Sequence, residues 1–382
     1  MEFSWSQDQL DLYKRTTAFA RSHRNRPVGC ASNGSFPRDV WDACGEFGLL
    51  GLSVPTEYGG MGLSALTTAG VQEAFGLGCL DAGLMFSASA HLFACIMPIV
   101  EHGSAELKQR ILPRLARGSL IAGNAMTESE AGSDISAIAT RAVRDGDSYI
   151  LTGTKNYVTN GPIADVFVTY ATLNPEHGFM GVAAFLVERG ADSTGVVVGK
   201  PFEKMGLGSS PISTVYFDSC RVPAANMLGA EGQGSSIFQS SMHWERTCLF
   251  AGFLGAMERQ IADVTDFARR RIQGRRPIGK HQAIAHRIAD MRLRHDAAQM
   301  LLYRACWLMD SGADASLAVA LAKLAISESA IDVGLGSIQI HGGMGYAVES
   351  GIEVALRDAV PLTIFSGTSE IQRNIIAAKL GL

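Results

Sequence analysis

Charged residues are scarce in this chain of 382 residues: Asp, Glu, Lys and Arg together make up 18% of it, whereas hydrophobic residues make up 47%. The formal net charge is −4, so the chain has no overall positive excess that would attract nucleic acid or an anionic membrane. We therefore expect neither as a partner. A chain of this length and apolar content is expected to bury a large core in two or three domains.

Signatures of metal and serine-hydrolase chemistry are also missing. No H-E-x-x-H or other metal-ligand spacing occurs, so we expect no metal site, and no G-x-S-x-G turn is present. The seven cysteines are odd in number and include no C-x-x-C pair, which argues against a disulfide framework. We expect them to be small buried hydrophobes: Cys30, Cys44, Cys79, Cys95, Cys220, Cys248 and Cys306.

A membrane span and an export leader are not evident either. The first residues, MEFSWSQDQLDLYKR, lack the basic-then-apolar order of a signal peptide and the acid-poor composition of a transit peptide. The apolar stretch at 315–326 is shorter than the roughly 20 residues that span a bilayer, and Lys323 interrupts it. We expect a soluble, cytoplasmic protein.

The pattern of residue types changes twice along the chain. Residues 5–120 are rich in helix formers separated by Gly and Pro, whereas 123–235 carry β-branched and aromatic runs with turn residues between them. Farther on, long apolar stripes return at helical spacing, for example at Leu317, Ala320, Leu321, Leu324 and Ala325. We predict a helical domain at 1–122, an antiparallel β domain at 123–235 and a helical bundle at 236–382.

Two segments rich in Gly and hydroxyl side chains lie within the predicted β domain. In MTESEAGSD, at 126–134, a turn could present backbone N–H groups and hydroxyls to a polar heteroaromatic ring or a phosphate, although a capping turn explains it too. In GTKNYVTNG, at 153–161, Tyr157 and Thr159 stand two apart and so share one face of a strand, or form the edge of a hairpin.

A basic run, ARRRIQGRRPIGK, occupies residues 268–280. It contains the G-x-x-x-x-G-K spacing of a phosphate loop, but His281 stands where that loop needs Ser or Thr, and Pro277 intrudes in a helical setting. We therefore reject nucleoside triphosphate binding. Arginine contacts to a pyrophosphate or a carrier phosphate, and a solvated helix end, both remain open.

Three further segments each allow an ordinary structural explanation. HGGMGY, at 341–346, contains a lone G-x-G that fits a helix stop better than a dinucleotide-binding turn. IFSGTSEIQR, at 364–373, places N–H groups at a helix start, as an anion site or an ordinary N-cap does. In HWERTCLFAG, at 243–252, Glu245 lies in an apolar helix beside Arg246, as a catalytic acid or as half of an ion pair.

Taken together and in this order, the segments resemble the acyl-CoA dehydrogenase family over the entire chain. Besides MTESEAGSD and GTKNYVTNG, the match includes FEKMGLGSS, VYFDSCRVP, QIHGGMGY and the terminal FSGTSEIQR. The resemblance implies an α+β, mostly α fold with an N-terminal helical domain, a middle antiparallel β domain and a C-terminal four-helix bundle. It also implies FAD as the cofactor, bound at a subunit interface of a homotetramer.

The resemblance assigns cofactor contacts to residues from several segments. The flavin ring and diphosphate would contact the residues of two segments, Met126, Thr127, Gly132, Ser133, Tyr157 and Thr159. A neighbouring subunit would hold the adenosine and pyrophosphate through Arg271, Gln282, Gln339, Gly342 and Gly343. Two residues would reach the cofactor from the C-terminal end, Thr368 and Glu370. The family's R-x-x-F-G reads RIQGR here, so its Phe and second Gly are lost.

A departure from the commoner family pattern identifies the catalytic base. Many members have Glu directly before G-T-S, but Ser366 stands there, and a serine hydroxyl cannot take up an α-proton at neutral pH. Other members, the isovaleryl type among them, place Glu before Arg on a bundle helix, which matches Glu245 and Arg246. The resemblance therefore implies Glu245 as the base, with Trp244, Arg246, Ser366 and Gly367 as substrate contacts.

The implied reaction is oxidation of the Cα–Cβ bond of an acyl thioester. A backbone N–H near Ser366 and a flavin hydroxyl would polarise the thioester, Glu245 would remove the α-proton, and a hydride would pass to the flavin. Apolar neighbours that include Trp244 and Leu249 would raise the pKa of Glu245 and exclude water.

Two strings, FGLGCLDAGLMFSASAHLFACIMPIVEHG and FQSSMHWERTCLF, resemble the prolyl-carrier-protein dehydrogenases of pyrrole-forming antibiotic and toxin pathways. That resemblance implies an L-prolyl thioester on a peptidyl carrier protein, oxidised to the pyrrole-2-carboxyl thioester. The arginines at 269–276 are then a candidate docking surface for an acidic carrier. Two alternatives stay open, a short branched-chain acyl-CoA dehydrogenase and a non-catalytic flavoprotein of the same fold.

Overall fold

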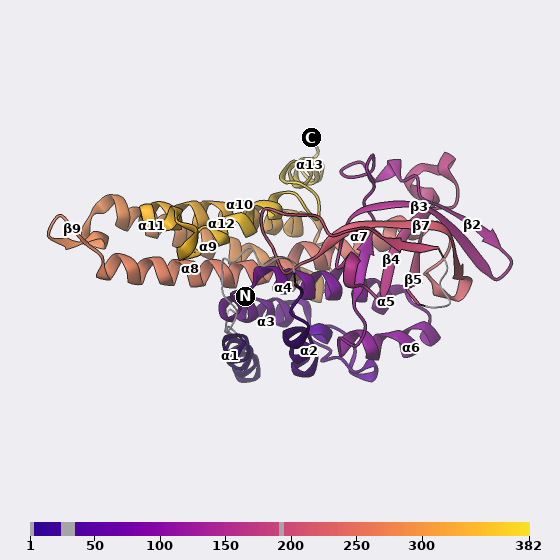
Figure 1. Ribbon diagram of the computed structural model, residues 1–382, viewed down its shortest axis with the longest axis horizontal. Coiled ribbons are helices and arrows are strands. Elements are labelled where there is room, and N and C mark those ends of the chain that lie inside the picture. Colours follow the sequence, from indigo (N-terminus) through magenta and orange to yellow (C-terminus); the bar gives the residue numbers. More distant parts are fainter. Residues whose placement is uncertain (1–3, 24–34, 191–194) are drawn as a thin grey trace.

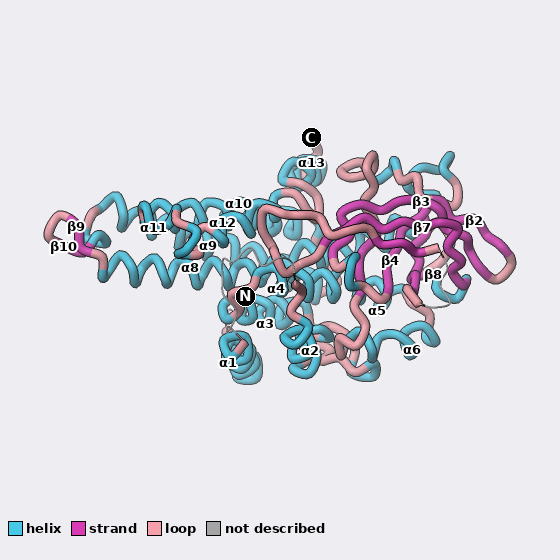
Figure 2. Tube along the Cα trace, viewed as in Figure 1, coloured by secondary structure: helices cyan, strands magenta, loops and turns pink. Residues whose placement is uncertain are grey.

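The computed structural model describes residues 4–23, 35–190 and 195–382, and its helices and strands separate into distinct regions (Figures 1 and 2). The N-terminal region is helical. Its helices are α1 (Gln7–Ser22), α2 (Arg38–Phe47), α3 (Ala65–Gly78), α4 (Ala82–Ser89), α5 (Met97–His102) and α6 (Ala105–Ala116). The chain stays helical between α4 and α5 through a π-helical segment, η3 (Ala90–Ile96).

Short polar side chains begin four of these helices, because each accepts a hydrogen bond from a first-turn N–H: Ser6, Ser64, Asp81 and Ser104. The continuous helix Ala82–His102 is long and apolar enough to cross a membrane, but 94% of its apolar window is buried inside the protein. Leu92, Phe93 and Ile96 on it are fully buried. Within the described residues it is therefore a core helix.

The middle region is one mixed sheet. Its strands are β1 (Ala122–Ala125), β2 (Arg141–Asp145), β3 (Ser148–Thr159), β4 (Val166–Thr172), β5 (Val182–Glu188), β6 (Val196–Val198), β7 (Ile212–Pro223) and β8 (Met227–Leu228). Most neighbours pair antiparallel, as predicted, in the order β6-β7-β3-β2-β4-β5-β8. β1 and β2 instead both run parallel to β4, because the β2–β3 hairpin reverses the chain before β4 re-enters the sheet.

The sheet has apolar side chains on both faces. On β4, Val166, Val168 and Tyr170 join the large core shared with the helices, whereas Phe167 and Ala171 belong to a second core within the β region. Such two-sided burial explains why β4 reads as a nearly continuous apolar run and not as an alternating one.

Helices form the C-terminal region, and the longest of them extend away from the sheet (Figure 1). They are α7 (Gly234–Trp244), α8 (Phe250–Arg270), α9 (Gln282–Asp310), α10 (Ser316–His341), α11 (Gly343–Tyr346), α12 (Val354–Ala359) and α13 (Ser369–Lys379). A π-helical turn, η8 (Glu245–Leu249), joins α7 to α8. The small hairpin of β9 (Ile272–Gln273) and β10 (Arg276–Pro277) caps the far end between α8 and α9.

The face of α10 that packs inward differs from the predicted stripe. Of that stripe only Ala320 is buried, whereas Leu317, Leu321, Leu324 and Ala325 are only partly covered. The helix buries a second set instead, which includes Ala318, Ala322, Lys323 and Ile326. Because α10 is apolar on nearly every side, helical spacing could not indicate which side faces the core.

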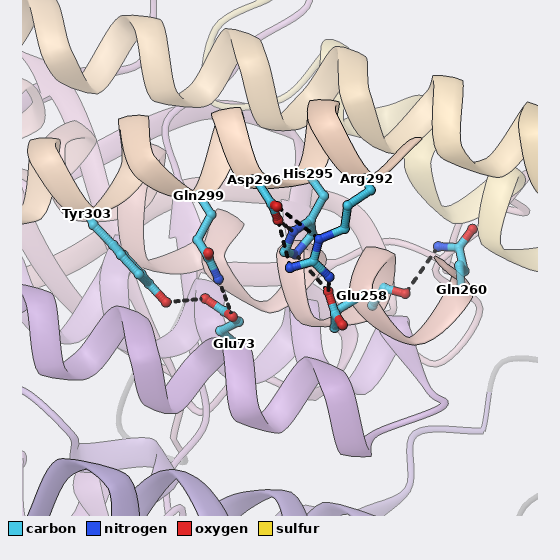
Figure 3. Close-up of polar contacts among 9 residues, drawn as sticks. Glu73, Glu258, Gln260, Arg292, His295, Asp296, Gln299 and Tyr303 are labelled. Carbon is cyan, nitrogen blue, oxygen red and sulfur yellow. Dashed lines mark hydrogen bonds and ion pairs between the residues drawn. The ribbon is translucent and has the colours of Figure 1, made fainter. Parts of the chain in front are cut away.

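A polar network inside the helical region joins α3, α8 and α9 (Figure 3). Glu73 accepts hydrogen bonds from Gln299 Nε2 at 2.7 Å and from Tyr303 Oη at 2.6 Å. Arg292 donates to Glu258 at 2.6 Å, about two turns from Gln299 along α9. The network ties the N-terminal helices to the C-terminal ones with directional bonds inside an otherwise apolar contact.

The cysteines mostly behave as expected. Five of those described are buried and unpaired, Cys44, Cys95, Cys220, Cys248 and Cys306. Cys79 is partly exposed, and Cys30 lies outside the described residues.

Candidate active site

Glu245 lies where two π-helical segments meet. It is the first residue of η8, and η8 contacts η3 of the core helix. A π-helical turn displaces the side chains that follow it from their usual helical positions, and such turns are frequent at functional sites. The sequence favours this site locally because small and apolar residues, Thr247 and Cys248 among them, are buried on both sides of the contact.

The two oxygens of the Glu245 carboxylate have different environments. Ser366 Oγ donates a short hydrogen bond to Oε1. Oε2 is buried and has no hydrogen-bond partner among the described residues. Burial raises the pKa of Glu245, while the Ser366 hydrogen bond and the charges of Arg246 and Lys323 oppose that shift. A buried carboxylate with one free oxygen and a raised pKa can accept a proton from a bound molecule.

The turn at Ser366 and Gly367 is fixed from two sides. Both residues have left-handed backbones, with φ of 55° and 86°. Arg246 Nε donates to the Ser366 carbonyl at 2.9 Å, and Gln372 Nε2 donates to the Gly367 carbonyl at 3.0 Å. A Cβ on Gly367 would come within 2.9 Å of Gln372 Nε2 and 3.2 Å of an Arg246 guanidinium nitrogen. Only glycine therefore fits this turn closely.

Aromatic side chains pack beside the turn that binds the carboxylate, and the Trp244 side chain has partners of its own. The Phe365 ring packs at 4.6 Å from Phe86 and at 5.3 Å from Phe250, centroid to centroid. Trp244, in contrast, stacks parallel to Phe93 at 6.3 Å and donates from Nε1 to Glu101 at 2.7 Å. The structure thus brings Glu245, Arg246, Ser366 and Gly367 together, while Trp244 faces α5.

A buried ion pair joins the two segments predicted to hold the flavin. Lys155 Nζ donates to Glu128 at 2.7 Å and to the Met126 carbonyl at 3.0 Å. The backbone N–H of Asn156 also donates to the Thr127 carbonyl at 2.8 Å. Residues 126–128 and 155–157 therefore form one unit, in which Met126 is buried and Thr127 is partly exposed.

The remaining residues of these segments are more accessible. Tyr157 lies in an irregularity of β3, with φ of 57°, and its ring is 68% exposed beside Phe202. Thr159 is partly exposed, and Gly132 and Ser133 are exposed. A left-handed tyrosine is uncommon, and residues with such backbone conformations cluster at functional sites.

Unpaired polar atoms near the same segments test whether this region fits a flavin. Ser87 Oγ, Asn124 Oδ1 and Asn160 Oδ1 are buried and have no partner among the described residues. Asn160 Nδ2 meanwhile donates to the Ser87 carbonyl at 3.1 Å, which brings α4 next to the end of β3. Buried polar atoms normally have partners, so this set fits the hydrogen-bonding edge of a heteroaromatic cofactor.

The other predicted cofactor contacts lie in two places. Thr368 caps α13 and accepts from the Ile371 N–H at 3.3 Å, and Glu370 is exposed on the first turn. The rest lie at the far end of the helices: Arg271, Gln282, Gln339, Gly342 and Gly343. Since α8 has 21 residues, that end is roughly 30 Å from Glu245. Within one chain the arginine cluster is therefore not part of the Glu245 site.

Several residues of the site were not recognised from the sequence. They are Ser87, Asn124, Glu128, Lys155, Asn160, Lys323 and Gln372. Glu128 and Lys155 occur in the two quoted motifs, and Lys323 interrupts an apolar run, so the sequence contained a signal for each of these three residues. In the parts of the chain that the structure describes, no group of three or more His, Cys, Asp or Glu gathers as a metal site would.

Family models cover nearly the whole chain. The model for the acyl-CoA dehydrogenase N-terminal domain matches residues 6–119, the middle-domain model matches 123–220, and the C-terminal-domain model matches 232–381. The chain therefore belongs to the acyl-CoA dehydrogenase family, which confirms the predicted family and fold class.

Within that family, two curated relatives align over the full length. The L-prolyl-[peptidyl-carrier protein] dehydrogenase of Pseudomonas fluorescens is 51% identical, with 100% of each chain covered. The protein of the same name from a Serratia species is 42% identical, with 100% of this chain and 99% of the relative covered. Both belong to the enzyme class predicted from the sequence, the FAD-dependent acyl-thioester dehydrogenases.

Solved structures agree in fold over the same length. The prolyl acyl carrier protein oxidase AnaB superimposes with a TM-score of 0.97 and 41% identity, covering 99% of this chain and 100% of its own. PigA with FAD and proline also gives 0.97 and 41%, with 100% of both chains covered. The predicted cofactor, FAD, is thus the one bound in a structure of this fold.

Proposed function

We propose that this protein oxidises an L-prolyl thioester carried by a peptidyl carrier protein to the pyrrole-2-carboxyl thioester, with FAD as the oxidant. The observation that supports it most directly is Glu245, a buried carboxylate with one unpaired oxygen, beside a fixed turn and aromatic walls. The full-length relatives that act on prolyl carrier proteins support the substrate class. The overall change removes four hydrogens, as two successive two-electron oxidations, and an external electron acceptor such as oxygen would reoxidise the flavin after each of them.

In this proposal each residue around Glu245 has a physical task. Glu245 accepts the α-proton on Oε2, the oxygen without a partner. Ser366 holds the other oxygen, and Arg246 fixes the Ser366 carbonyl, so the turn stays aligned with the base. Phe86, Phe365 and other apolar side chains exclude water, which keeps the proton transfer between base and substrate. FAD, when bound, supplies the hydride acceptor.

The cofactor would be shared between two subunits. Residues of the joined segments, Met126, Thr127, Gly132, Ser133, Tyr157 and Thr159, would contact the flavin, together with Thr368 and Glu370. The distant set, Arg271, Gln282, Gln339, Gly342 and Gly343, would contact the FAD of a neighbouring subunit, because it lies roughly 30 Å from Glu245 along α8. We accordingly propose a homotetramer, with each chain divided at 1–122, 123–235 and 236–382.

The setting proposed for this enzyme is a cytoplasmic pathway to a pyrrole-containing antibiotic or toxin. No membrane contact is required, because the one apolar helix of sufficient length among the described residues is buried in the core. The candidate docking surface at 269–276 would serve a carrier whose prolyl group enters the site of the neighbouring subunit.

Mass spectrometry of a prolyl-loaded carrier protein tests the proposed reaction. Incubation with the FAD-loaded enzyme is expected to lower the mass of the acyl group by about 4 units, the four hydrogens removed in total. The same incubation with Glu245→Gln should leave the mass unchanged. An unchanged carrier with wild-type enzyme would contradict the proposal.

Acyl-CoA controls separate the alternatives. One relative, the mitochondrial isovaleryl-CoA dehydrogenase of Solanum tuberosum, is 36% identical and covers 90% of this chain. Flavin reduction by isovaleryl-CoA, with none by the prolyl carrier, would favour a short branched-chain acyl-CoA dehydrogenase. Reduction by neither thioester would favour a non-catalytic flavoprotein.

A further inference from the structure

Lys323 is a fully buried lysine whose ammonium group has no hydrogen-bond partner among the described residues. It lies in the middle of α10, and its side chain is 0% exposed. Its Nζ is 5.5 Å from the centroid of the Phe250 ring. Phe250 in turn packs on Phe365, next to the turn at Ser366. A buried, unpaired ammonium is costly, so its presence behind the candidate active site calls for a functional explanation.

The charges around Lys323 come from three directions. On η8, Glu245 and Arg246 act on it; on α13, Glu370 does; and on α10 itself, Glu328 does. Glu370 is exposed and Glu328 is already paired with Arg373, so neither neutralises Lys323 inside the site. Two positive charges, those of Arg246 and Lys323, therefore act on the single carboxylate of Glu245.

We propose that Lys323 is a positioning residue whose positive charge keeps the Glu245 carboxylate ionised in an apolar site and so ready to accept the α-proton. The inference rests on the proposed function of Glu245 as the base. Lys323 contacts neither of the groups that would react, and it acts across the aromatic wall formed by Phe250 and Phe365.

Two physical effects oppose one another at Glu245. Burial raises the pKa of Glu245, which favours the protonated form that cannot accept a proton. The charges of Arg246 and Lys323 act in the opposite direction. Arg246 is already engaged with the Ser366 carbonyl, whereas the charge of Lys323 is committed to no hydrogen bond.

A purely structural role and a positioning role of Lys323 predict different melting temperatures for Lys323→Met. Lys323→Met keeps an unbranched side chain that is one atom shorter and removes a buried charge that has no hydrogen bond, so we expect an unchanged or higher melting temperature. If the role of Lys323 were to stabilise the fold, the same substitution would lower the melting temperature. The comparison therefore distinguishes the two explanations before any activity is measured.

The ionisation of Glu245 can be measured without substrate by infrared difference spectroscopy on the FAD-loaded protein. The C=O band of its protonated carboxyl is identified as the band missing in Glu245→Gln. In Lys323→Met this band should persist to a pH about one unit higher than in the wild type, and Lys323→Arg should restore the wild-type midpoint. Lys14→Met, on exposed α1, is the matched control and should change nothing.

Single-turnover flavin reduction by the prolyl carrier gives the second measurement. Its rate in Lys323→Met should fall about tenfold on the acidic limb, which corresponds to a shift of one pH unit, and should approach the wild-type rate at high pH. The rates of the wild type and of Lys323→Met should converge at high pH, because burial and Arg246 lower the pKa of Lys323 to about 8. Above that pH the wild type loses this charge as well.

The outcomes separate this inference from the proposed function. An identical infrared midpoint in the wild type and Lys323→Met would overturn the role of Lys323, whatever the substrate is. A shifted midpoint in a protein whose flavin no thioester reduces would support that role and overturn the proposed function. A lowered melting temperature with an unshifted midpoint would make Lys323 a structural residue.

Discussion

Ser366 donates its hydroxyl to the Glu245 carboxylate, while its carbonyl accepts from Arg246 Nε at 2.9 Å. Ser366 occupies the position at which many family members have a glutamate. It thus donates a hydrogen bond to Glu245, the glutamate that is proposed as the base in this chain. This contact links the turn before α13 to the start of η8, two segments 121 positions apart in the chain.

Ser366→Ala should move the acidic limb of the pH–rate profile upward. The hydroxyl stabilises the ionised form of Glu245, so its loss raises the pKa of a group already raised by burial. Below that pKa the base is protonated, and flavin reduction at neutral pH should slow by about tenfold or less. Stopped-flow reduction between pH 5 and 9 would test it. A profile that loses rate equally at every pH would instead indicate a substrate contact.

Glu245→Gln should abolish proton abstraction without preventing cofactor binding. General-base residues typically contribute about 10²- to 10⁴-fold to the rate, and among the described residues Glu245 is the carboxylate to which the Ser366 hydroxyl donates. Flavin reduction should fall by at least that range, with the visible flavin spectrum unchanged. Glu245→Asp is the matched control and should retain partial activity. Wild-type rates in Glu245→Gln would exclude this residue as the base.

Gly367→Ala should damage the site more than its backbone strain alone can explain. Gly367 and Gly381 both have left-handed backbones, with φ of 86° and 82°. A Cβ on Gly367 meets Gln372 and Arg246, whereas a Cβ on Gly381 has nothing within 4 Å. Gly381→Ala is therefore the control for the strain itself, which is about 1 kcal/mol. Activity should be lost only in Gly367→Ala, and equal activities would contradict the role given to the turn.

Lys155→Met should release FAD and destabilise the protein. It leaves Glu128 buried without its cation, which typically costs about 3–5 kcal/mol, and it separates the two segments that the pair joins. The double variant Glu128→Gln with Lys155→Met removes both charges and should recover much of the stability. Chemical unfolding and the ratio of flavin to protein are the two measurements. Full FAD retention in Lys155→Met would show that the ion pair does not organise the cofactor segments.

Glu73→Gln should change how stability depends on pH. Burial raises the pKa of Glu73, so its favourable contribution is present when it is protonated, below its unfolded pKa, and is lost as pH rises through its folded pKa. The stability of Glu73→Gln relative to the wild type should therefore increase with pH. Urea unfolding at a series of pH values measures this difference. A difference that stays constant would show that Glu73 does not change its pKa on folding.

Much of the site's chemistry could be read from residue types in order. Residue types alone indicate the segments at 126–134 and 153–161, Glu245 beside Arg246, and Ser366 before Gly367. Local sequence patterns could predict these segments because the formation of a turn, a cap or a strand depends mainly on residues that are close in sequence. The direction of Trp244 could not be read in this way, because it depends on α5 and on Glu101, which lie far away in the chain.

Residue order alone is enough to predict the order of helical, β and helical regions, the family, and a charged pair at 245 and 246 in an apolar helix. The buried face of α10, the pairing of Lys155 with Glu128 and the absence of a hydrogen-bond partner for Lys323 among the described residues follow from the packing of distant segments. The reason is physical: helical and strand periods arise from bonds between near neighbours, whereas burial and charge pairing depend on which distant segments pack together.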